Sequence, residues 1–339
     1  MDWSQKKVLV TGGTSFISSH LIDLLVEKGV RDVRVVDDLT SGKLANIQGH
    51  IDSGIVDFRQ EDLLHPGVAQ RAVEGVHVVF HLAAIHGGRG YVDLHQAACA
   101  QNLAMDGMLI KAAHEAGVEK LVFASSGCVY PNFLQGDVTK ELYLTEEMVG
   151  PPYDADNMYG WAKLMTEMTL QAYHRDFGLK AASCRFFTVY GERGVENHAV
   201  IAMIARAFVR QNPFEVWGDG TQIRNWTYVG DIVRGMALCA EKIDDGTAVN
   251  LGTEERTRVI DAVREVLRYT GHEADVKFLP HMPTGPLNRV ASNRLAKELL
   301  GWAPQMKFMD GLHRTIDWYF SSRQREVVSG YLQEMLTER

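Results

Sequence analysis

The feature that most constrains the fold is a regular alternation of two patterns between residues 7 and 125. Apolar runs rich in β-branched residues lie at 7–11, 32–37, 55–60, 76–84 and 120–126. Amphipathic helical patterns such as 20–29 and 102–117 separate them, and a helix over 159–177 and a strand over 180–191 follow. Apolar strands alternating with helices are typical of βαβ units, whose parallel sheet is covered on both faces. We therefore predict an α/β protein with a doubly wound, Rossmann-like parallel sheet.

The second part of the chain has a different texture. After Gly191 the elements are shorter, and prolines interrupt the stretch 279–289. We expect a dinucleotide-binding domain over 1–191 and a smaller, interleaved lobe over 192–339 that binds a substrate. The last stretch, 325–339, predicts a terminal amphipathic helix of no evident chemistry.

Composition and charge exclude several classes of function. A formal net charge of −8 argues against a nucleic-acid partner, because phosphate binding needs clustered Lys and Arg. No apolar run is long enough for a membrane span or a signal peptide, so we expect a cytoplasmic protein without membrane contact. The four cysteines lack CxxC spacing, which favours reduced thiols. His86 and His198 are isolated and lack metal-ligand spacing, so no metal site is predicted.

The stretch from Thr11 to His20, TGGTSFISSH, follows the first predicted strand and opens a helix. Such a turn binds phosphate, since unpaired backbone N–H groups and the helix dipole point at the anion. In the pattern G-x-x-G-x-x-G, Gly12 keeps the first place, but Ser15 and Ser18 replace the second and third glycines. Ser18 is small enough to pack, whereas the side chain of Ser15 obstructs the pyrophosphate. We expect NAD binding to be lost or weakened by about one to a few kcal/mol; a turn that merely connects strand to helix is the alternative.

Two acidic residues favour a dinucleotide site. Asp37 ends the second strand about twenty residues after the turn, where an acid accepts hydrogen bonds from the adenosine ribose. Asp62 follows the third strand and is either a helix cap or a partner of the adenine amino group. Both acids occur in the order that a dinucleotide-binding unit requires.

A tyrosine and a lysine give the strongest chemical signal. Tyr159 and Lys163 lie four residues apart on a predicted helix and hence on one face. An ammonium beside a phenol favours the phenolate, which lowers the tyrosine pKa toward a value useful for proton transfer. Ser126 ends the preceding parallel strand, at the edge where doubly wound sheets carry their sites. We expect its hydroxyl to bond a sugar hydroxyl or keto oxygen.

Together these motifs resemble the extended short-chain dehydrogenases/reductases of the nucleotide-sugar epimerase and dehydratase family. The resemblance runs over nearly the whole chain, through TGGTSFISSH, VVDDL, HLAA, ASSGCVY, YGWAK, RFFTVYG and WGDGTQIRNWTYVGD. Within the family, HLAAIHGGRGYV and ASSGCVYP are most similar to the GDP-mannose 3,5-epimerases. The resemblance implies NAD, a nucleotide-sugar substrate and a homodimer formed through paired helices, here 91–116 and 159–177.

The resemblance also implies roles for residues that match the family's motifs. Ser126, Tyr159 and Lys163 correspond to the catalytic serine, tyrosine and lysine, Asn102 to an asparagine that supports the site, and Cys128 to a proton donor or acceptor at a sugar carbon. The implied cofactor contacts are Gly12, Ser15, Phe16, Ile17, Asp37, Asp62, Leu63, Ala83 and Lys163. The implied substrate contacts are Gly87, Gly88, Gly90, Thr188, Asn197, Trp217, Gln222, Arg224 and Arg289. The two arginines are expected to clamp the diphosphate, which suits the guanidinium fork.

Several positions depart from the family. Thr188 stands where the relatives have an asparagine, and past Gly191 the 3,5-epimerases carry a lysine that partners the cysteine. This chain offers Asn197 and His198 instead. His198 is either a general acid/base, since imidazole titrates near neutral pH, or a structural loop histidine.

These signals predict an isomerase that acts on a nucleotide-activated hexose, most closely a GDP-sugar, without net redox change. In the mechanism implied by the resemblance, hydride passes from the sugar to NAD and back, and the intermediate keto sugar epimerises. Without NAD, the alternative is a GDP-hexose pyranose–furanose mutase, of the flavin-independent kind that resembles this family in antibiotic pathways. A non-catalytic sugar-nucleotide-binding protein is a third hypothesis, against which the intact Ser126, Tyr159 and Lys163 argue.

Overall fold

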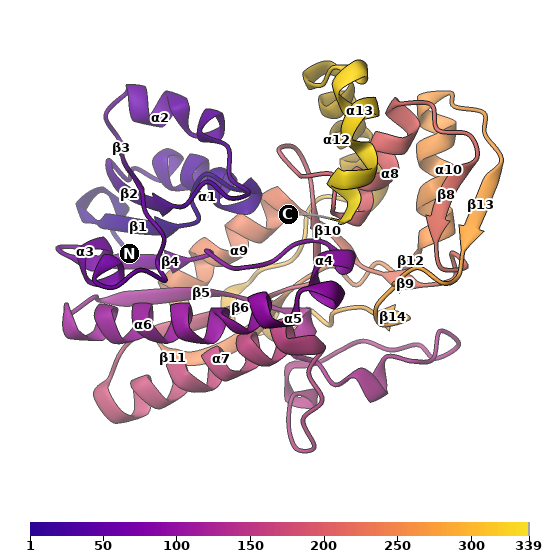
Figure 1. The fold of residues 1–339 in the computed structure, drawn as a ribbon. Coiled ribbons are helices and arrows are strands. Elements are labelled where there is room, and N and C mark those ends of the chain that lie inside the picture. The colour runs from indigo at the N-terminus through magenta and orange to yellow at the C-terminus, as the bar shows by residue number, and fades with distance from the viewer. Residues whose placement is uncertain (338–339) are drawn as a thin grey trace.

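The computed structural model describes residues 1–337, and a seven-stranded sheet runs through its centre (Figure 1). The strand order is β11-β6-β5-β4-β1-β2-β3, and every neighbouring pair is parallel. The order reverses between β1 and β4, which is where ligands bind in doubly wound sheets. The predicted parallel sheet is confirmed. Its strands are β1 Lys7–Thr11, β2 Asp32–Asp37, β3 Val56–Gln60, β4 Val78–His81, β5 Lys120–Ser126, β6 Ala181–Phe186 and β11 Asp245–Leu251.

Helices cover both faces of this sheet. Figure 1 shows α1 and α9 above it and α6 and α7 below it. Helix α1 packs against α9, and α6 packs between α3 and α7. The helices of this part are α1 Phe16–Glu27, α2 Gln48–Asp52, α3 Val68–Val73, α4 Arg89–Leu94, α5 Gln96–Ala100, α6 Asn102–Glu115, α7 Asn157–Phe177 and α9 Val229–Lys242.

The central strands are continuous apolar runs because both of their faces are buried. Along β1, Val8 and Val10 join the core beneath α1 and α9, whereas Leu9 joins the core formed with α3 and α6. All three side chains are fully buried. Each such buried side chain contributes about 1.5–3 kcal/mol to the free energy of unfolding relative to an exposed one. The two cores therefore hold the strands in place, and with them the carboxyl edge of the sheet where the site is built.

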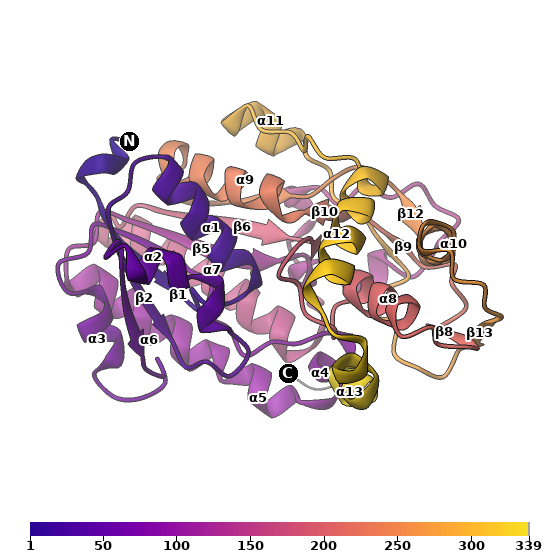
Figure 2. The same ribbon diagram turned by 90° about the horizontal axis from the view of Figure 1, so that it is seen from above.

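The remaining elements form small sheets and helices beside the carboxyl edge of the main sheet (Figure 2). The chain leaves the main sheet after Phe186, so the single strand predicted over 180–191 is in fact two, and β7 pairs with β10. Helix α9 and strand β11 then return to the main sheet from beyond residue 191; the domain boundary at that residue stays a prediction. These elements are β7 Thr188–Tyr190, α8 Ala199–Phe208, β8 Phe214–Trp217, β9 Ile223–Arg224, β10 Trp226–Tyr228, β12 Thr257–Arg258, α10 Val259–Thr270, β13 Val276–Leu279, β14 Asn288–Arg289, α11 Arg294–Leu300, α12 Phe308–Ser322 and α13 Arg325–Thr337.

Two further expectations concern membranes and thiols. Between residues 1 and 337, no helix has both the length and the apolar character needed to cross a membrane. All four cysteines are free thiols, as predicted, and only Cys128 is partly exposed. The predicted terminal helix is present as α13, apart from residues 338–339, which lie outside the described residues.

Candidate active site

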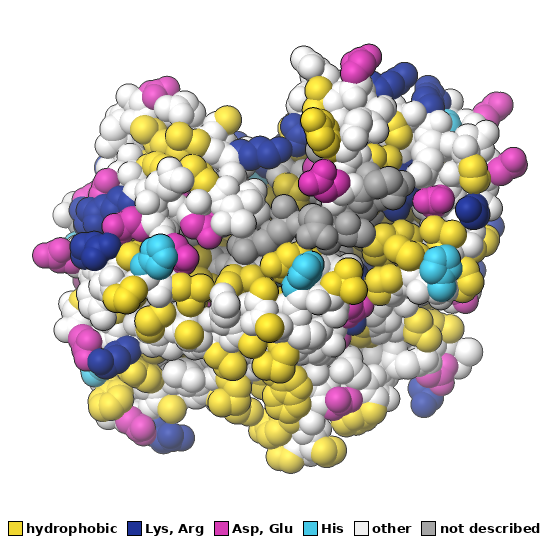
Figure 3. Space-filling model, viewed as in Figure 1, with side chains coloured by type: hydrophobic (Ala, Val, Ile, Leu, Met, Phe, Trp, Pro, Cys, Tyr) yellow, Lys and Arg dark blue, Asp and Glu magenta, His cyan; other side chains and the backbone are white. Residues whose placement is uncertain are grey.

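A cleft of about 1050 Å³ opens at the carboxyl ends of β1, β2, β4 and β5 and continues between α8, β8 and α10. Figure 3 shows the surface hollowed between the part that carries α2 and the part that carries α12. This volume is at the upper end of the range for ligand pockets. The predicted site residues that line the cleft are Gly12, Ser15, Phe16, Ile17, Asp37, Asp62, Leu63, Ala83, Gly87, Gly88, Ser126, Cys128, Tyr159, Lys163, Thr188, Asn197, His198, Trp217, Gln222, Arg224 and Arg289.

Two predicted residues do not line the cleft. Gly90 is buried inside the first turn of α4, behind the residues that line the cleft. Asn102 is fully buried beneath the loop after β4. Its amide oxygen accepts from the backbone N–H of Ile85 (2.8 Å), and its amide nitrogen donates to the Ile85 carbonyl (2.9 Å). Asn102 therefore holds the loop that forms one wall of the cleft.

The glycines that precede α4 are required by packing within the protein. A Cβ on Gly88 would lie 1.8 Å from the carbonyl oxygen of Asn197, and one on Gly87 would lie 2.6 Å from the Cβ of Tyr91. Both glycines line the cleft, but these contacts already explain why neither position tolerates a side chain.

The turn after β1 retains the geometry of an anion site. Gly12 has φ +65°, and a Cβ there would lie 3.0 Å from the backbone of Ala83. Helix α1 begins at Phe16, with Ser15 as its N-cap residue, and the Ser15 side chain makes no capping hydrogen bond. The first amides of α1 are thus left for a ligand at the cleft. Ser15 is partly exposed there, which puts its side chain at the mouth of this anion site.

Asp37 is occupied by its own chain, through a residue that the sequence motifs did not single out. The hydroxyl and backbone N–H of Thr14 donate to one carboxylate oxygen (2.6 and 3.0 Å), and the N–H of Leu39 donates to the other (2.9 Å). A carboxylate offers about four acceptor positions, so three are already filled. Gly42 closes over this contact, since a Cβ there would lie 1.8 Å from the Thr14 hydroxyl.

Asp62 takes the structural role that was its alternative. Its carboxylate accepts from the backbone N–H of Leu64 at 2.8 Å and so caps the turn after β3. The side chain stays about a third exposed, and its second oxygen lies 4.0 Å from the Nε2 of His65.

Tyr159, Lys163 and Ser126 meet on one side of the cleft. Tyr159 lies in the first turn of α7 and Lys163 one turn later, and both are buried. The Lys163 Nζ lies 4.5 Å from the ring centroid of Phe123 and 5.6 Å from that of Tyr159. Gly160 lets α7 approach this closely, because a Cβ there would lie 2.3 Å from the carbonyl oxygen of Cys128.

Burial reverses the pKa shift that the sequence suggested for Tyr159. Its pKa is raised well above the usual value, first by burial and then by the negative groups of Cys128 and Asp106, while a hydrogen bond with Ser126 opposes the shift. Burial also lowers the pKa of Lys163. The expected lowering of the tyrosine pKa by Lys163 is therefore not found, and the phenol is protonated at neutral pH.

Two histidines that are far apart in the sequence come together over Tyr159. The ring centroid of His86 lies 5.1 Å from that of Tyr159 and 5.4 Å from that of His198. Burial lowers the pKa of His198 to about 4, so its imidazole is neutral at pH 7 and can accept a proton. The expectation of an ordinary imidazole pKa does not hold here. Within residues 1–337, no group of three or more His, Cys, Asp or Glu side chains is arranged to hold a metal ion.

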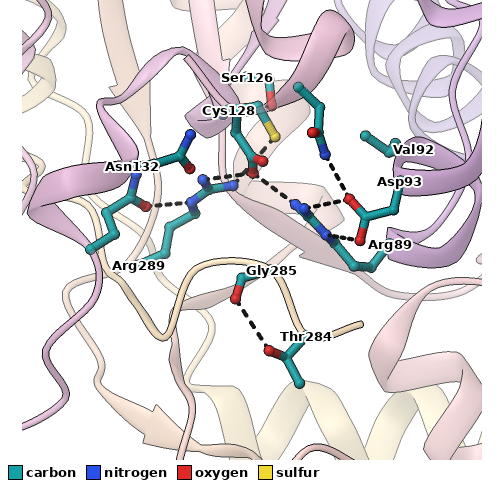
Figure 4. A network of polar contacts seen from close by, with 12 residues as sticks. Arg89, Val92, Asp93, Ser126, Cys128, Asn132, Thr284, Gly285 and Arg289 are labelled. Atoms are coloured by element: carbon teal, nitrogen blue, oxygen red, sulfur yellow. Dashed lines mark hydrogen bonds and ion pairs between the residues drawn. The ribbon is translucent and has the colours of Figure 1, made fainter. Parts of the chain in front are cut away.

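An ion-pair network surrounds Cys128 (Figure 4). Arg289 donates to the Cys128 Sγ (3.3 Å), to Asp156 (3.0 Å) and to the side-chain oxygen of Gln135 (2.6 Å). Arg89, from α4, donates to the same Asp156 oxygen at 2.8 Å. Both guanidinium groups thus donate to one oxygen of Asp156, and Figure 4 shows Cys128 close to Arg289. The sulfur thus sits against a guanidinium that one carboxylate holds in place.

Arg224 differs from the other two arginines. It donates only to the backbone carbonyls of Ile223 (2.9 Å) and Thr284 (2.8 Å), and no acidic side chain of residues 1–337 pairs with it. Its enclosed setting and the neighbouring guanidinium groups of Arg289 and Arg89 lower its pKa to about 9. The cleft therefore carries an uncompensated positive charge beside Cys128, which suits an anionic ligand.

A buried polar chain, also missed by the motifs, links the turn after β1 to α7. The Thr11 hydroxyl lies 2.8 Å from one ring nitrogen of His81, and the other ring nitrogen lies 2.9 Å from Asp106. The hydroxyl of Thr166, three residues past Lys163, donates to the second oxygen of Asp106 at 2.8 Å. A satisfied buried network of this kind rigidifies the elements that it joins.

The chain is similar to known proteins over almost its whole length. Residues 8–252 match the model of the NAD dependent epimerase/dehydratase family. The chain is 31% identical to GDP-mannose 3,5-epimerase 1 of Oryza sativa subsp. japonica, over 97% of this chain and 86% of the relative. It is also 31% identical to GDP-mannose 3,5-epimerase of Arabidopsis thaliana, over 96% and 85%. The crystal structure of a Bacillus cereus UDP-glucuronic acid 4-epimerase, in complex with UDP-glucuronic acid and NAD, matches with a TM-score of 0.82 at 28% identity, over 92% of this chain and 98% of that one. The chain belongs to the NAD dependent epimerase/dehydratase family.

Proposed function

We propose that the protein isomerises a nucleotide-activated hexose without net redox change, and that a GDP-sugar is its substrate. One observation carries the proposal: Tyr159, Cys128 and His198 face one cleft whose neighbouring cation, Arg224, lacks an acidic partner among the described residues. The similarity to two plant GDP-mannose 3,5-epimerases supports the choice of a GDP-sugar.

The arginines define where the substrate lies. Guanidinium groups bind diphosphates through paired hydrogen bonds, and Arg224 has donors to spare. Arg289 is the register partner of Arg224 between β14 and β9 and contacts the Cys128 sulfur at 3.3 Å. A hexose attached to a diphosphate held by both arginines therefore reaches Cys128 and Tyr159.

Three side chains then share the proton transfers. Tyr159 starts protonated, since burial raises its pKa, and exchanges its proton with a sugar oxygen. Cys128 exchanges a proton at a sugar carbon, with the Arg289 guanidinium stabilising negative charge on its sulfur. His198 is neutral at pH 7 and accepts a proton from the sugar in place of the missing lysine. Proton transfer by positioned groups of this kind contributes about 10²–10⁴-fold each.

The residues of the turn after β1 fit NAD, with a weaker hold than glycines alone would give. Gly12 leaves a bare backbone at the turn, and the free amides at the start of α1 face the cleft. Ser15 narrows the approach, and Asp37 has about one acceptor position left for a ribose hydroxyl. When bound, NAD supplies reversible hydride acceptance from the sugar.

The contact between Thr14 and Asp37 favours a second candidate, an NAD-independent GDP-hexose pyranose–furanose mutase. Because the Asp37 carboxylate already accepts hydrogen bonds from its own chain, it is less available to the ribose of a dinucleotide. The Ser15 side chain also weakens dinucleotide binding, since it narrows the approach to the turn. Tyr159, Cys128 and His198 would then rearrange the sugar ring by acid/base chemistry alone.

Turnover with and without the cofactor separates the two candidates. We expect the purified protein to contain NAD, detected by absorbance after denaturation, and cofactor-stripped protein to lose turnover of GDP-hexoses until NAD is added. Full turnover by stripped protein would favour the mutase. Tight binding of GDP-sugars without any product would contradict both and leave a binding protein.

Substitution of Tyr159 tests the role that both candidates share. Tyr159→Phe should lower kcat by about 10²-fold or more and leave GDP affinity, measured by calorimetry, unchanged. Tyr153→Phe, at an exposed tyrosine, is the matched control and should behave as wild type. Unchanged turnover in Tyr159→Phe would show that the phenol takes no part in the reaction.

A further inference from the structure

One face of α8 connects the candidate active site to a chamber at the far end of the cleft. His198 is the N-cap residue of α8, and Ala199, Ala202, Met203 and Arg206 line the cleft. These spacings of three, four and seven residues define one helical face. By helical rise, Arg206 lies about 12 Å along the axis from His198. The chamber is thus about one sugar-diphosphate length away from the reacting groups.

The walls of this chamber are apolar, apart from two charged side chains. Val259 and Val263, one turn apart on α10, line it together with Met203 of α8, against which α10 packs. Arg206 and Glu215, from α8 and β8, also line it. A flat heterocycle between aliphatic walls, with polar groups at its edge, is what such a chamber accommodates.

Arg206 is a buried cation without a partner in the chain. Its side chain makes no hydrogen bond and no ion pair with any side chain that the structure describes, its Nε is buried and unpaired, and the residue is 5% exposed. Burial lowers its pKa to about 10, and Glu215 is the one charge that opposes this shift. An unpaired buried charge is costly, so a ligand atom that accepts hydrogen bonds is the missing partner.

Glu215 supplies the complementary acceptor. Its carboxylate lies 3.8 Å from the Lys277 ammonium, which is too far for a hydrogen bond, and it accepts none from residues 1–337. Tyr331 and Glu334 of α13 also line the cleft, and Glu334 already has an interaction within the protein. The chamber therefore presents the unpaired guanidinium of Arg206 beside a carboxylate that has one ion pair, with Lys277, and no hydrogen-bond donor among the described residues.

We propose that Arg206 and Glu215 select guanine as the base of the nucleotide sugar. This inference rests on the proposed function and deepens it. The guanidinium donates to the acceptors O6 and N7 of guanine, and the carboxylate accepts from N1–H and the 2-amino group. Uracil offers one such donor instead of two. Adenine places an acceptor, its N1, against the carboxylate, and cytosine presents the same mismatch at N3.

Binding of free nucleoside diphosphates tests this selection without requiring turnover. In calorimetry with wild-type protein we expect GDP to bind about 100-fold or more tightly than ADP and about 10-fold more tightly than IDP, which lacks only the 2-amino group. Glu215→Gln should remove the difference between GDP and IDP. Arg206→Met should weaken both by about 10-fold or more. Glu273→Gln, at an exposed acid, is the matched control and should change neither.

Each outcome of this experiment decides one question. Equal affinities of wild-type protein for GDP, IDP and UDP would overturn the selection of guanine, even if a nucleotide sugar is isomerised. Equal weakening of all nucleotides and of pyrophosphate in Arg206→Met would assign this arginine to phosphate and also overturn it. Preference for GDP without turnover of any GDP-sugar would instead refute the proposed function and leave base selection intact.

Discussion

Replacing Ser15 with glycine should tighten NAD binding. The serine stands at the N-cap of α1 with φ −81° and ψ 176°, a conformation that glycine shares, and its side chain makes no capping bond. The helix should therefore lose no more than a few tenths of a kcal/mol. The gain comes from removing atoms at the anion site: steric overpacking costs about 1–3 kcal/mol. Since about 1.4 kcal/mol changes an affinity tenfold, we expect NAD to bind roughly 5- to 140-fold more tightly.

A second variant separates the two parts of the serine side chain. Ser15→Ala removes the hydroxyl but keeps the Cβ, so it should recover only part of the gain if the Cβ obstructs the pyrophosphate. NAD affinity is measured by calorimetry on cofactor-stripped protein, and thermal unfolding checks that α1 is intact. If Ser15→Gly bound NAD no more tightly than wild type, the steric argument would be wrong. Equal gains in both variants would place the obstruction in the hydroxyl alone.

Two further predictions concern pH and assembly. Burial holds the pKa of His198 near 4, below its unfolded value, so the unfolded chain binds more protons between these values and stability falls as pH falls. Between pH 7.5 and pH 5 the free energy of unfolding of wild-type protein should therefore fall by up to roughly 2 kcal/mol more than that of His198→Asn, as measured by urea titration. His65→Asn, at an exposed histidine, is the control and should behave as wild type. Equal losses in wild type and His198→Asn would contradict the prediction. Trp161 and Met165 are exposed one turn apart on α7, so Trp161→Lys should convert a homodimer into a monomer by light scattering. A wild-type protein that is monomeric at all concentrations would refute the dimer.

Most of the fold could be predicted because its signals are local. The periodicity of each apolar run fixes a strand or a helix without knowledge of its neighbours, and the parallel sheet follows from their alternation. The break between β6 and β7 was missed, because a continuous apolar run does not say which partner it pairs with. That partner, β10, starts 38 residues after β7 begins.

Sequence analysis could predict those parts of the candidate site whose residues are close together in the sequence. Tyr159 and Lys163 share a helix, so four residues of separation suffice to place them together. Asp156 joins Arg89 and Arg289 across 67 and 133 residues, and no local pattern announces such contacts. The glycine after Tyr159 was a usable signal, since α7 can approach Cys128 only where a Cβ is absent.

The pKa shifts of the site residues could not be predicted from their neighbours in the sequence, because burial in the folded protein is the largest cause of each shift. Lys163 was expected to lower the pKa of Tyr159, yet both groups are desolvated, and each is shifted toward its neutral form. Burial likewise lowers the pKa of His198 below the near-neutral value that is usual for histidine. Residue type gives the reference pKa, and only the packed structure gives the direction of the shift.

Three cations of the cleft share one unusual property that bears on what the cleft is for. Lys163, Arg224 and Arg206 all line it, and none forms an ion pair with a side chain that the structure describes. Lys163 and Arg206 are buried and Arg224 is partly buried. Buried cations elsewhere in the protein are paired, such as Arg185 with Glu167 and Lys120 with Asp244. An unpaired buried charge destabilises the empty protein, and a ligand with acceptor atoms at each position offsets that cost. A nucleotide sugar carries such atoms at its hexose, its diphosphate and its base, so a single extended ligand matches all three.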